Sequence, residues 1–493
     1  MTGTTLRINT ESSIGKISPR IYGHFAEHLG RCCYDGLWLG NNPQAAEFVR
    51  EGFHKEVLTA LQALPVPLLR WPGGCYAEHY HWRDGIGPTG ERPRRLGMSC
   101  GLQVVDDNSL GTHEFMRLCE LLGAEPYLAG NLGNGSPQEL CDWIEYCNST
   151  TPTTLVQERQ ANGASKPFGV KLWGIGNENW GCGGNFDSVT YAHEYRRFAT
   201  MIRHTDPMAE LVACGYDDSW NRELLQTLGN KIDLVDHLSI HQYWIKGGPE
   251  TGFNEDEYYT LLAEAATTED FIQRTAQIIE EATGGKQRIG VALDEWGVWH
   301  PEARNWGDKS NPRTPTTYEQ AGTLRDAIAA AIALEGFHRQ CRVLSLANLA
   351  QVVNVLHAPV MTQGVRMWVT PTYHVLRLHA SHIGATALEV EVVQGDNLAD
   401  GNSAISATAS RRENGSVAVT VINKHLSQVG SVRLTGLEDF AGGQGQILTA
   451  ERPDAQNSLD EPERVQPAAL EIHRDGNSWL VEMPPHAVAT LVF

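Results

Sequence analysis

The sequence is poor in positive charge. Its 493 residues contain 39 Lys and Arg against 59 Asp and Glu, which gives a net charge of −20. A charge of this sign repels nucleic acid phosphates and anionic membrane surfaces. Long apolar runs are missing too, because no stretch of about 18 uninterrupted apolar residues occurs. We therefore predict no nucleic acid partner, no membrane association and a neutral ligand.

Signals for secretion and for metal binding are also scarce. The first residues lack a basic region followed by an apolar core, which predicts a cytoplasmic protein. Ten cysteines are present, but they are scattered and no Cys-x-x-Cys pair occurs. This spacing indicates neither a zinc site nor a disulfide framework, and we predict that most of the thiols are reduced and buried. No metal and no cofactor are expected.

The pattern of apolar segments predicts two domains, since the chain is too long for one hydrophobic core. From about residue 17 to 380, short apolar runs alternate with segments of helical periodicity, as in βα units around a parallel sheet. After residue 381 the period changes to two, as in Ser416–Ile422 and Trp479–Met483. The predicted fold is α/β: a (β/α)₈ TIM barrel over residues 17–380 and an antiparallel, jelly-roll-like β-sandwich over residues 381–493. Residues 1–16 are expected to join the sandwich as an edge strand.

Eight apolar runs fit the strands of such a barrel, and eight βα units are what closure requires. The runs are Ile17–Glu27, Pro67–Gly74, Glu125–Gly133, Lys171–Glu178, Leu211–Tyr216, Leu234–Tyr243, Arg288–Glu295 and Val343–Gln351. Helical periodicity is present between them, for example over Thr112–Leu122, Tyr191–His204, Glu255–Thr283 and Tyr318–Gly336. Two long loops, 88–110 and 298–317, follow the second and seventh runs.

Two glutamates stand at strand ends, where a barrel of this kind carries its chemistry. Glu178 and Glu295 each follow an apolar run directly. One strand-end glutamate is more often an ion-pair partner, but two of them, flanked by Asn or Trp, favour hydrolysis of a glycosidic bond. That reaction needs a proton for the leaving oxygen and a carboxylate for the oxocarbenium-like centre. Asn177 is placed to bind a sugar hydroxyl.

Aromatic and imidazole side chains accompany these strand ends. Trp180 and Trp296 follow the two glutamates and are expected to offer apolar faces to a sugar ring. His241 ends the sixth run, where an orienting role is favoured over that of a catalytic base. Trp299 and Trp306 of the seventh loop either clamp the substrate or anchor the loop, and the sequence does not separate these alternatives.

Several motifs together resemble glycoside hydrolase family 51, which contains mainly α-L-arabinofuranosidases. The resemblance covers essentially the whole chain. The motifs are Ile21-Tyr-Gly-His-Phe-Ala-Glu-His-Leu-Gly, Arg70-Trp-Pro-Gly-Gly, Gly176-Asn-Glu-Asn-Trp-Gly-Cys-Gly-Gly, Asp294-Glu-Trp and Ala347-Asn-Leu-Ala-Gln-Val-Val-Asn-Val.

This resemblance implies a retaining, exo-acting enzyme for arabinose-containing oligosaccharides, assembled as a homo-oligomer, often a hexamer. It implies that Glu178 is the general acid/base and Glu295 the nucleophile, with Tyr243 hydrogen-bonded to Glu295. The positions implied to contact the furanose are Glu27, Asn177, Tyr243 and Gln351, and Cys75 occupies a position at which members differ.

The segment after Cys75 departs from the family pattern. An Asp is expected at the position of Glu78, and an acidic or small residue at His79. Both are expected to line the sugar pocket, where changes of this size shift discrimination by about 1–3 kcal/mol. These two positions are therefore expected to influence which sugar the pocket accepts, while the class of reaction follows from the two glutamates.

Other functions are compatible with parts of the pattern. His24-x-x-Glu27-His28 formally matches an inverted zinc-protease motif, but the segment is too short for the helix that motif needs. Cys75 is interpreted as a pocket-lining thiol rather than a nucleophile. The same glutamate pair would also serve a β-D-galactofuranosidase, a β-xylosidase or an endo-β-glucanase. A non-catalytic sugar-binding barrel is a further alternative, which predicts loss of at least one glutamate.

Overall fold

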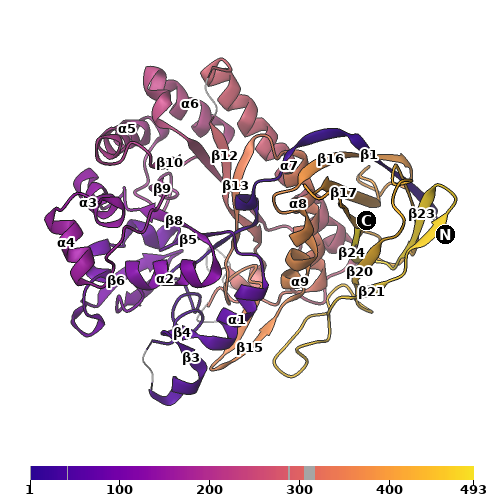
Figure 1. The fold of residues 1–493 in the computed structure, drawn as a ribbon, viewed down its shortest axis with the longest axis horizontal. Helices are drawn as coiled ribbons and strands as arrows, with labels where there is room; N and C mark the ends of the chain where they lie inside the picture. The colour runs from indigo at the N-terminus through magenta and orange to yellow at the C-terminus, as the bar shows by residue number, and fades with distance from the viewer. Residues whose placement is uncertain (1, 41–42, 287–288, 305–316) are drawn as a thin grey trace.

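A computed structural model describes residues 2–40, 43–286, 289–304 and 317–493. Two bodies lie side by side in Figure 1: a barrel surrounded by helices and, at its right, a sheet built mainly from the orange-to-yellow C-terminal residues. Among the described residues, no helix combines the length and the apolarity needed to cross a membrane.

The barrel is closed by eight parallel strands, each paired with its neighbours in chain order, and the last returns to the first. Each strand lies at one of the eight predicted runs, so the TIM barrel is confirmed. Their side chains are almost all buried, which explains why the runs are continuously apolar. The strands are β2 (Gly23–Phe25), β5 (Leu68–Trp71), β8 (Glu125–Gly130), β9 (Leu172–Ile175), β10 (Glu210–Ala213), β11 (His237–Trp244), β12 (Gly290–Val298) and β13 (Leu344–Ala350).

Helices cover the outside of the barrel. The predicted helices at residues 112–122 and 255–283 match α2 and α7, and the one at 191–204 lies within α5. The fourth begins later than predicted, because Thr323 and Asp326 form a capping box that starts α8 after the left-handed Tyr318. The helices are α1 (Lys55–Ala63), α2 (Thr112–Leu122), α3 (Pro137–Asn148), α4 (Thr154–Ala161), α5 (Ser188–Thr205), α6 (Asp218–Leu228), α7 (Glu255–Thr283), α8 (Leu324–Arg339) and α9 (Pro371–Leu378).

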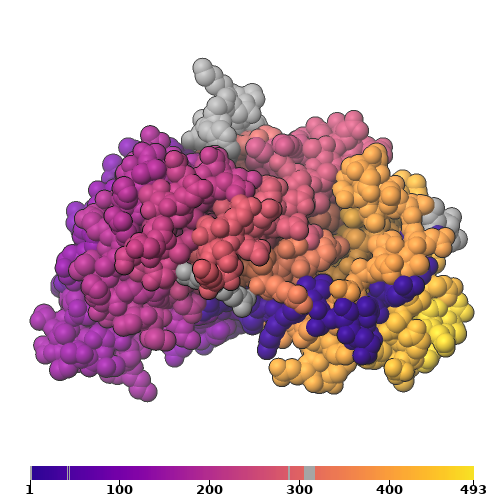
Figure 2. Space-filling view, turned by 90° about the horizontal axis from the view of Figure 1, so that it is seen from above, coloured from indigo at the N-terminus to yellow at the C-terminus, as the bar shows by residue number. Residues whose placement is uncertain are grey.

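The second body is a ten-stranded, mostly antiparallel sheet with a hydrophobic core of its own. The N-terminal strand lies in the middle of this sheet, antiparallel to β16 and parallel to β19, so the prediction of an edge strand is wrong. Figure 2 shows the indigo N-terminal segment lying against the C-terminal residues. In sheet order the strands are β21 (Ala468–Leu470), β20 (Gln444–Leu448), β24 (Ala487–Val492), β18 (Val417–Asn423), β17 (Ile405–Arg411), β16 (Thr386–Gln394), β1 (Thr2–Lys16), β19 (Gly430–Thr435), β23 (Ser478–Met483) and β22 (His473–Asp475).

Three short hairpins complete the sheet structure. The hairpin β6–β7 lies inside the long loop predicted at residues 88–110, and Ser99, the last residue of β6, donates a hydrogen bond to Glu27. This loop is therefore more ordered than its composition indicates. The hairpins are β3 (Val49–Arg50) with β4 (Phe53–His54), β6 (Arg95–Ser99) with β7 (Leu102–Asp106), and β14 (Val360–Gln363) with β15 (Arg366–Val369).

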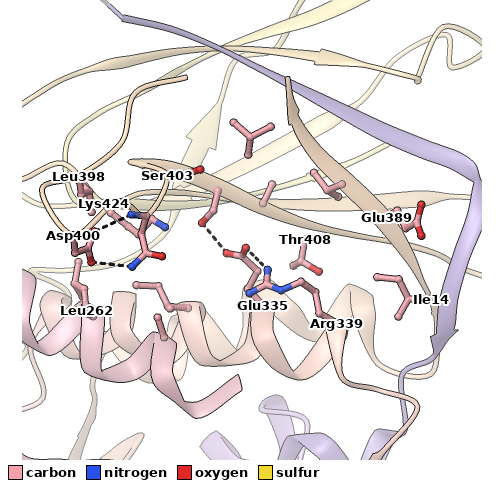
Figure 3. Close-up of a pocket in the computed structure, with 18 of the residues that line it drawn as sticks. Ile14, Leu262, Glu335, Arg339, Glu389, Leu398, Asp400, Ser403, Thr408 and Lys424 are labelled. Carbon is pink, nitrogen blue, oxygen red and sulfur yellow. Dashed lines mark hydrogen bonds and ion pairs between the residues drawn. The ribbon is translucent and has the colours of Figure 1, made fainter. Parts of the chain in front are cut away.

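A cavity of about 370 Å³ opens where the barrel meets the sheet, between α7 and α8 on one side and β16 and β17 on the other. Figure 3 shows Glu335 and Arg339 of α8 pointing towards each other in it. The carboxylate of Glu335 accepts hydrogen bonds from Arg339 (2.5 Å) and from Ser406 (2.7 Å), so it is already engaged. This cavity lies away from the carboxyl ends of the barrel strands. In a barrel of this kind, the active site lies at those strand ends.

Buried histidines join the barrel to the sheet. His338 of α8 bonds to Tyr22 through Nε2 (2.7 Å) and to Thr408 of β17 through Nδ1 (2.9 Å). His382 lies in the 3-10 helix η8 (His379–His382) and bonds to Ser410 and Thr420 of the sheet. Burial lowers the pKa of both rings well below the ordinary value of 6.5. These hydrogen bonds therefore form between neutral groups.

We expect the protein to lose stability as the pH falls from about 6.5 to 4. Burial lowers the pKa of His379 to about 4 in the folded protein, whereas in the unfolded chain it is near 6.5. Below pH 6.5 the unfolded chain binds protons that the folded protein rejects, which costs about 1.4 kcal/mol per pH unit for each such histidine. Urea unfolding at several pH values measures this slope.

The matched variant for this measurement is His379→Gln. The Nδ1 atom of His379 lies 2.8 Å from the carbonyl oxygen of Val375, and a glutamine amide keeps a donor without titrating. The slope between pH 6.5 and 4 should become shallower in the variant. An unchanged slope would show that His379 does not contribute to it.

Candidate active site

The carboxyl ends of β9 and β12 bring the two predicted glutamates together. Glu178 lies in the turn after β9, and Glu295 lies inside β12. An oxygen of one carboxylate lies within 4.8 Å of an oxygen of the other. The turn depends on Gly176, because a Cβ at that position would lie 2.1 Å from the Oδ1 of Asn179. Neighbouring carboxylates of this kind are found in retaining glycosidases, where they lie about 5 to 5.5 Å apart.

An irregularity in β12 directs two successive carboxylates into the barrel mouth. His241 of β11 pairs with Glu295, whereas Ser239 pairs with Ala292, so β12 contains one extra residue. Such a bulge breaks the alternation of side chains between the two faces of a strand. Asp294 then accepts hydrogen bonds from Tyr127 and Ser239, both of which are buried.

Glu295 is held at both oxygens. Arg70 donates from Nη1 to Oε1 at 2.8 Å, and the hydroxyl of Tyr243 donates to Oε2 at 2.7 Å. Arg70 is nearly inaccessible to solvent, and the charges of Asp294 and Glu295 overcome its burial and raise its pKa. A permanent cation therefore faces Glu295, which suits an anionic nucleophile. Arg70 also donates to the Oδ1 of Asn177 at 2.6 Å.

His241 connects the two glutamates. Its Nδ1 lies 2.8 Å from an oxygen of Glu178 and 3.5 Å from one of Glu295, and its Nε2 lies 3.2 Å from Asp294. Burial lowers the pKa of His241, but the charges of Glu295 and Asp294 and the hydrogen bonds to Asp294 and Glu178 raise it to about 10. The ring is thus an imidazolium at neutral pH, with both nitrogens protonated. This favours the orienting role over that of a base.

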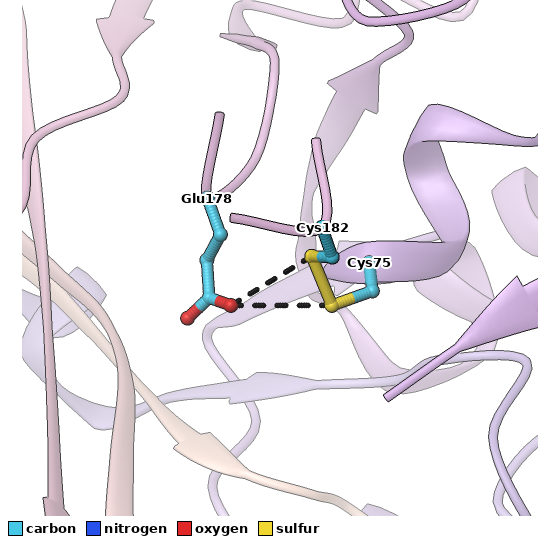
Figure 4. Close-up of side chains that lie close together, drawn as sticks. All are labelled: Cys75, Glu178 and Cys182. Atoms are coloured by element: carbon cyan, nitrogen blue, oxygen red, sulfur yellow. Dashed lines mark hydrogen bonds between the residues drawn. A yellow bond between two sulfur atoms is a disulfide. The ribbon is translucent and has the colours of Figure 1, made fainter. Parts of the chain in front are cut away.

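A disulfide between Cys75 and Cys182 lies beside Glu178 (Figure 4). The sulfur atoms of Cys75 and Cys182 are 3.9 and 3.7 Å from the Oε2 of Glu178. The prediction that Cys75 is a free thiol is wrong, because folding brings together two cysteines that are 107 residues apart. His241 occupies Oε1 of Glu178, and Oε2 faces the disulfide.

Glu27 and Gln351 form a polar pair near Glu295. The Nε2 of Gln351 donates to Glu27 at 2.9 Å, and the other oxygen of Glu27 accepts from Ser99 at 2.8 Å. Burial, together with the charge of Glu295, raises the pKa of Glu27 to about 7. The Oε1 of Gln351 is buried and has no hydrogen-bond partner among the described residues.

Glu78 was expected to support the site or to line its pocket, and its buried carboxylate fits the supporting role. Its carboxylate is buried and accepts from the backbone nitrogens of Leu132, Gly133 and Asn177 at 2.6 to 2.7 Å. It also accepts from the side chain of Asn179. Burial raises the pKa of Glu78 to about 7, although these hydrogen bonds oppose the rise.

His79, the other departure from the family pattern, packs against the β6–β7 hairpin. A Cβ added at Gly97 of β6 would lie 3.3 Å from the Cβ of His79. Burial lowers the pKa of His79 below its ordinary value. The neutral ring therefore adds no charge beside the carboxylates.

The tryptophans take different places. Trp180 stacks on Tyr216, with ring centres 3.9 Å apart, and Tyr216 is 43% exposed. Trp296 is 1% exposed and packs on Phe337 of α8, so the prediction that it offers a face to the sugar is wrong. Trp299 donates to the carbonyl oxygen of Ala303, which anchors the start of its loop. Trp306 lies outside the described residues.

The zinc-protease interpretation finds no support. His28 is buried among the rings of Tyr34, Trp71 and Tyr76. In the part of the chain that the structure describes, two groups of side chains have the spacing of metal ligands, and neither contains His24 or His28. The groups are Cys75, Glu178 and Cys182, and Glu178, His241 and Glu295.

Several site residues were missed by the sequence analysis. Arg70 and Asp294 begin the polar ends of the predicted runs Pro67–Gly74 and Arg288–Glu295, and this position was a signal that could have found them. Ser99 stands in a segment read as a loop and gave no such signal. Cys182 stands four residues after Glu178, but its partner is not visible in the sequence.

Known proteins resemble this chain over nearly its whole length. Residues 60–259 match the family model of the α-L-arabinofuranosidase 1 domain, and residues 294–487 match that of the α-L-arabinofuranosidase C-terminal domain. An intracellular exo-α-L-arabinofuranosidase of Bacteroides ovatus is 36% identical over 99% of this chain and 95% of its own length.

Solved structures agree with this likeness. The arabinofuranosidase of glycoside hydrolase family 51 from Xanthomonas axonopodis pv. citri superposes with a TM-score of 0.91, at 32% identity and with full coverage of both chains. The α-L-arabinofuranosidase of Thermotoga maritima, solved as an arabinose complex, has a TM-score of 0.87 at 29% identity, again with full coverage of both chains.

Proposed function

The chain belongs to the α-L-arabinofuranosidases of glycoside hydrolase family 51, and from this premise we propose a double-displacement mechanism in which Glu178 is the acid/base and Glu295 the nucleophile. The protein is an exo-acting glycoside hydrolase of arabinofuranosides. One observation carries the mechanism: an oxygen of Glu178 lies within 4.8 Å of an oxygen of Glu295. An inverting pair is about 6.5 to 9.5 Å apart, to leave room for a water.

In the first step Glu295 attacks the anomeric carbon while Glu178 protonates the leaving oxygen. The hydrogen bonds from Arg70 and Tyr243 hold the carboxylate of Glu295 oriented for this attack. His241 binds one oxygen of Glu178, so the proton leaves from the other oxygen, Oε2. This step consumes the proton of Glu178 and forms a glycosyl-enzyme.

In the second step Glu178 acts as a base. Its ionised carboxylate takes a proton from water, which attacks the anomeric carbon from the face that the leaving group vacated. The bond to Glu295 breaks and the arabinose leaves with its original configuration. The protonated His241 stabilises whichever of the two glutamates is ionised at each stage.

Glu27, Asn177 and Gln351 are proposed to bind the hydroxyl groups of the furanose. The Oε1 of Gln351, which has no partner among the described residues, supports this role. The amide nitrogen of Asn177 supports it too, because it is directed at the sulfur of Cys182 and makes no bond to a backbone oxygen among the described residues. These bonds speed the reaction to the extent that they strengthen in the transition state. Trp180, stacked on Tyr216, is proposed to contact the rest of the oligosaccharide.

We place the protein in the cytoplasm as a homo-oligomer, such as a hexamer. The location is supported by the relative from Bacteroides ovatus, which is described as intracellular. The oligomer is what the family resemblance implies. Arabinose-containing oligosaccharides are the proposed substrates in that compartment.

A panel of aryl glycosides tests the substrate. We expect kcat/KM for the α-L-arabinofuranoside to exceed that for the β-D-galactofuranoside and the β-D-xyloside by about 100-fold or more, because buried groups such as Gln351 lose their partners with the wrong sugar. If kcat/KM for either rival glycoside is equal or higher, the arabinofuranoside is not the preferred substrate. The variant Glu295→Ala is assayed in parallel. It should lose activity on all three substrates if one site hydrolyses them all.

A further inference from the structure

The disulfide beside Glu178 has the composition of a metal site once it is reduced. Cys75, Cys182 and Glu178 present two sulfur atoms and one carboxylate oxygen within 4.8 Å of one another. Figure 4 shows the carboxylate of Glu178 directed at the sulfur pair. Thiolate and carboxylate are ligands that Zn²⁺ accepts in tetrahedral sites. No part of the proposed hydrolysis uses either sulfur atom.

On the carboxylate side, the distances are close to those of a zinc site. With Zn–S near 2.3 Å and Zn–O near 2.0 to 2.2 Å, a tetrahedral ion separates sulfur from oxygen by about 3.5 to 3.7 Å. The Oε2 of Glu178 lies 3.9 Å from the sulfur of Cys75 and 3.7 Å from that of Cys182. The two sulfur atoms must move from bonding distance to about 3.8 Å. Breaking the disulfide permits this movement, because two sulfur atoms that are no longer bonded to each other repel at bonding distance and must separate.

We propose that the reduced protein binds a thiophilic divalent cation such as Zn²⁺ through Cys75, Cys182 and Glu178, and that this ion blocks the acid/base group. The proposal rests on the proposed role of Glu178 and on a reducing, cytoplasmic location, where disulfides are rare. If zinc binds in this way, it inhibits the enzyme when the two cysteines are reduced and not when they form the disulfide.

The chemistry balances in two steps. A dithiol reductant gives two electrons to the Cys75–Cys182 bond, each sulfur takes up a proton, and the reductant becomes a cyclic disulfide. Zn²⁺ then displaces the two thiol protons into solvent and binds two thiolates and the ionised Glu178, with water in the fourth position. A carboxylate bound to zinc at Oε2 has no proton to donate there.

The experiment compares the whole protein in its oxidised and reduced forms, the latter freed of reductant under anaerobic conditions. Saturating Zn²⁺ should lower the activity of the reduced form by about 100-fold or more, the order of loss of a general acid, and EDTA should restore it. The oxidised form should keep its activity. Equal inhibition of both forms would overturn the proposal.

Binding is measured separately with Cd²⁺, whose thiolate complexes absorb in the near ultraviolet. We expect one equivalent to bind to the reduced protein, and Cys182→Ser and Cys75→Ser each to lose this absorption and the inhibition by Zn²⁺. Cys141→Ser, which changes a thiol of α3, is the matched control and should keep both. Inhibition that disappears in Cys100→Ser but persists in Cys182→Ser would place the ion elsewhere. The Cd²⁺ signal tests the site even if arabinofuranosides are not hydrolysed.

Discussion

Replacement of Glu295 by alanine should lower kcat on an aryl α-L-arabinofuranoside by about 10⁵-fold, the order of loss when a covalent nucleophile is removed. The variant loses the group that would form the glycosyl-enzyme, while Arg70 and Tyr243 lose the carboxylate that they now bind. Glu471→Ala, which changes an exposed carboxylate of the sheet domain, is the matched control and should keep full activity.

Azide makes the test specific for the nucleophile. The space left by the side chain of Glu295 admits a small anion next to Arg70, and azide attacks the anomeric carbon in place of the carboxylate. Turnover should return, with an arabinosyl azide of inverted configuration as the product, identified by NMR. A Glu295→Ala enzyme with unimpaired activity, or a rescued product of retained configuration, would exclude Glu295 as the nucleophile.

Replacement of Glu178 by alanine should separate substrates by their leaving groups. For an oligosaccharide, whose leaving alcohol needs a proton, kcat/KM should fall by about 10³-fold, within the range for a lost general acid. For an aryl substrate with an acidic phenol the fall should be about 10-fold or less, because that phenolate leaves without protonation. The ratio kcat/KM is the right measure, since it reports the first step only.

The same variant reports on the second step. Without the base, water attacks the glycosyl-enzyme slowly, but azide needs no base and should accelerate release. Its product should keep the configuration of the substrate, the opposite of the result expected for Glu295→Ala. Equal losses on both kinds of substrate, or an inverted azide product, would argue against Glu178 as the acid/base.

The two glutamates have different neighbours. Glu295 accepts hydrogen bonds from the guanidinium of Arg70 and from the hydroxyl of Tyr243. Glu178 lies against the disulfide with one oxygen and against His241 with the other. Two carboxylates in different environments can divide the proposed roles of nucleophile and acid between them.

The barrel and the position of both glutamates were predictable from the sequence. Strands buried on both faces must be apolar throughout, so each of the eight runs was visible against its neighbours. Strand ends face the ligand in this fold, and Glu178 and Glu295 stood at two of them. The motifs around these residues then indicated the family, which the comparisons confirmed.

The errors have local physical causes. Successive side chains of a strand point to opposite faces, so Trp296 turns outward to Phe337 of α8 when Glu295 turns inward. The bulge that brings Asp294 inward too depends on the pairing of β11 with β12, which a one-dimensional pattern does not contain. Glu78 was expected to line the pocket because it is close to Cys75 in the sequence. Its carboxylate instead accepts hydrogen bonds from the backbone of the loops that follow β8 and β9.

Which segments are buried, how they repeat and which carboxylates end the strands can be read from the order of residues, because burial and periodicity are properties of each segment alone. Which distant residues meet is settled only when the elements pack together. The tertiary structure joined Cys75 to Cys182 across 107 residues and placed β1 between β16 and β19. These choices depend on the packing of whole elements against one another, and the local pattern of residues is the same whichever partner is selected.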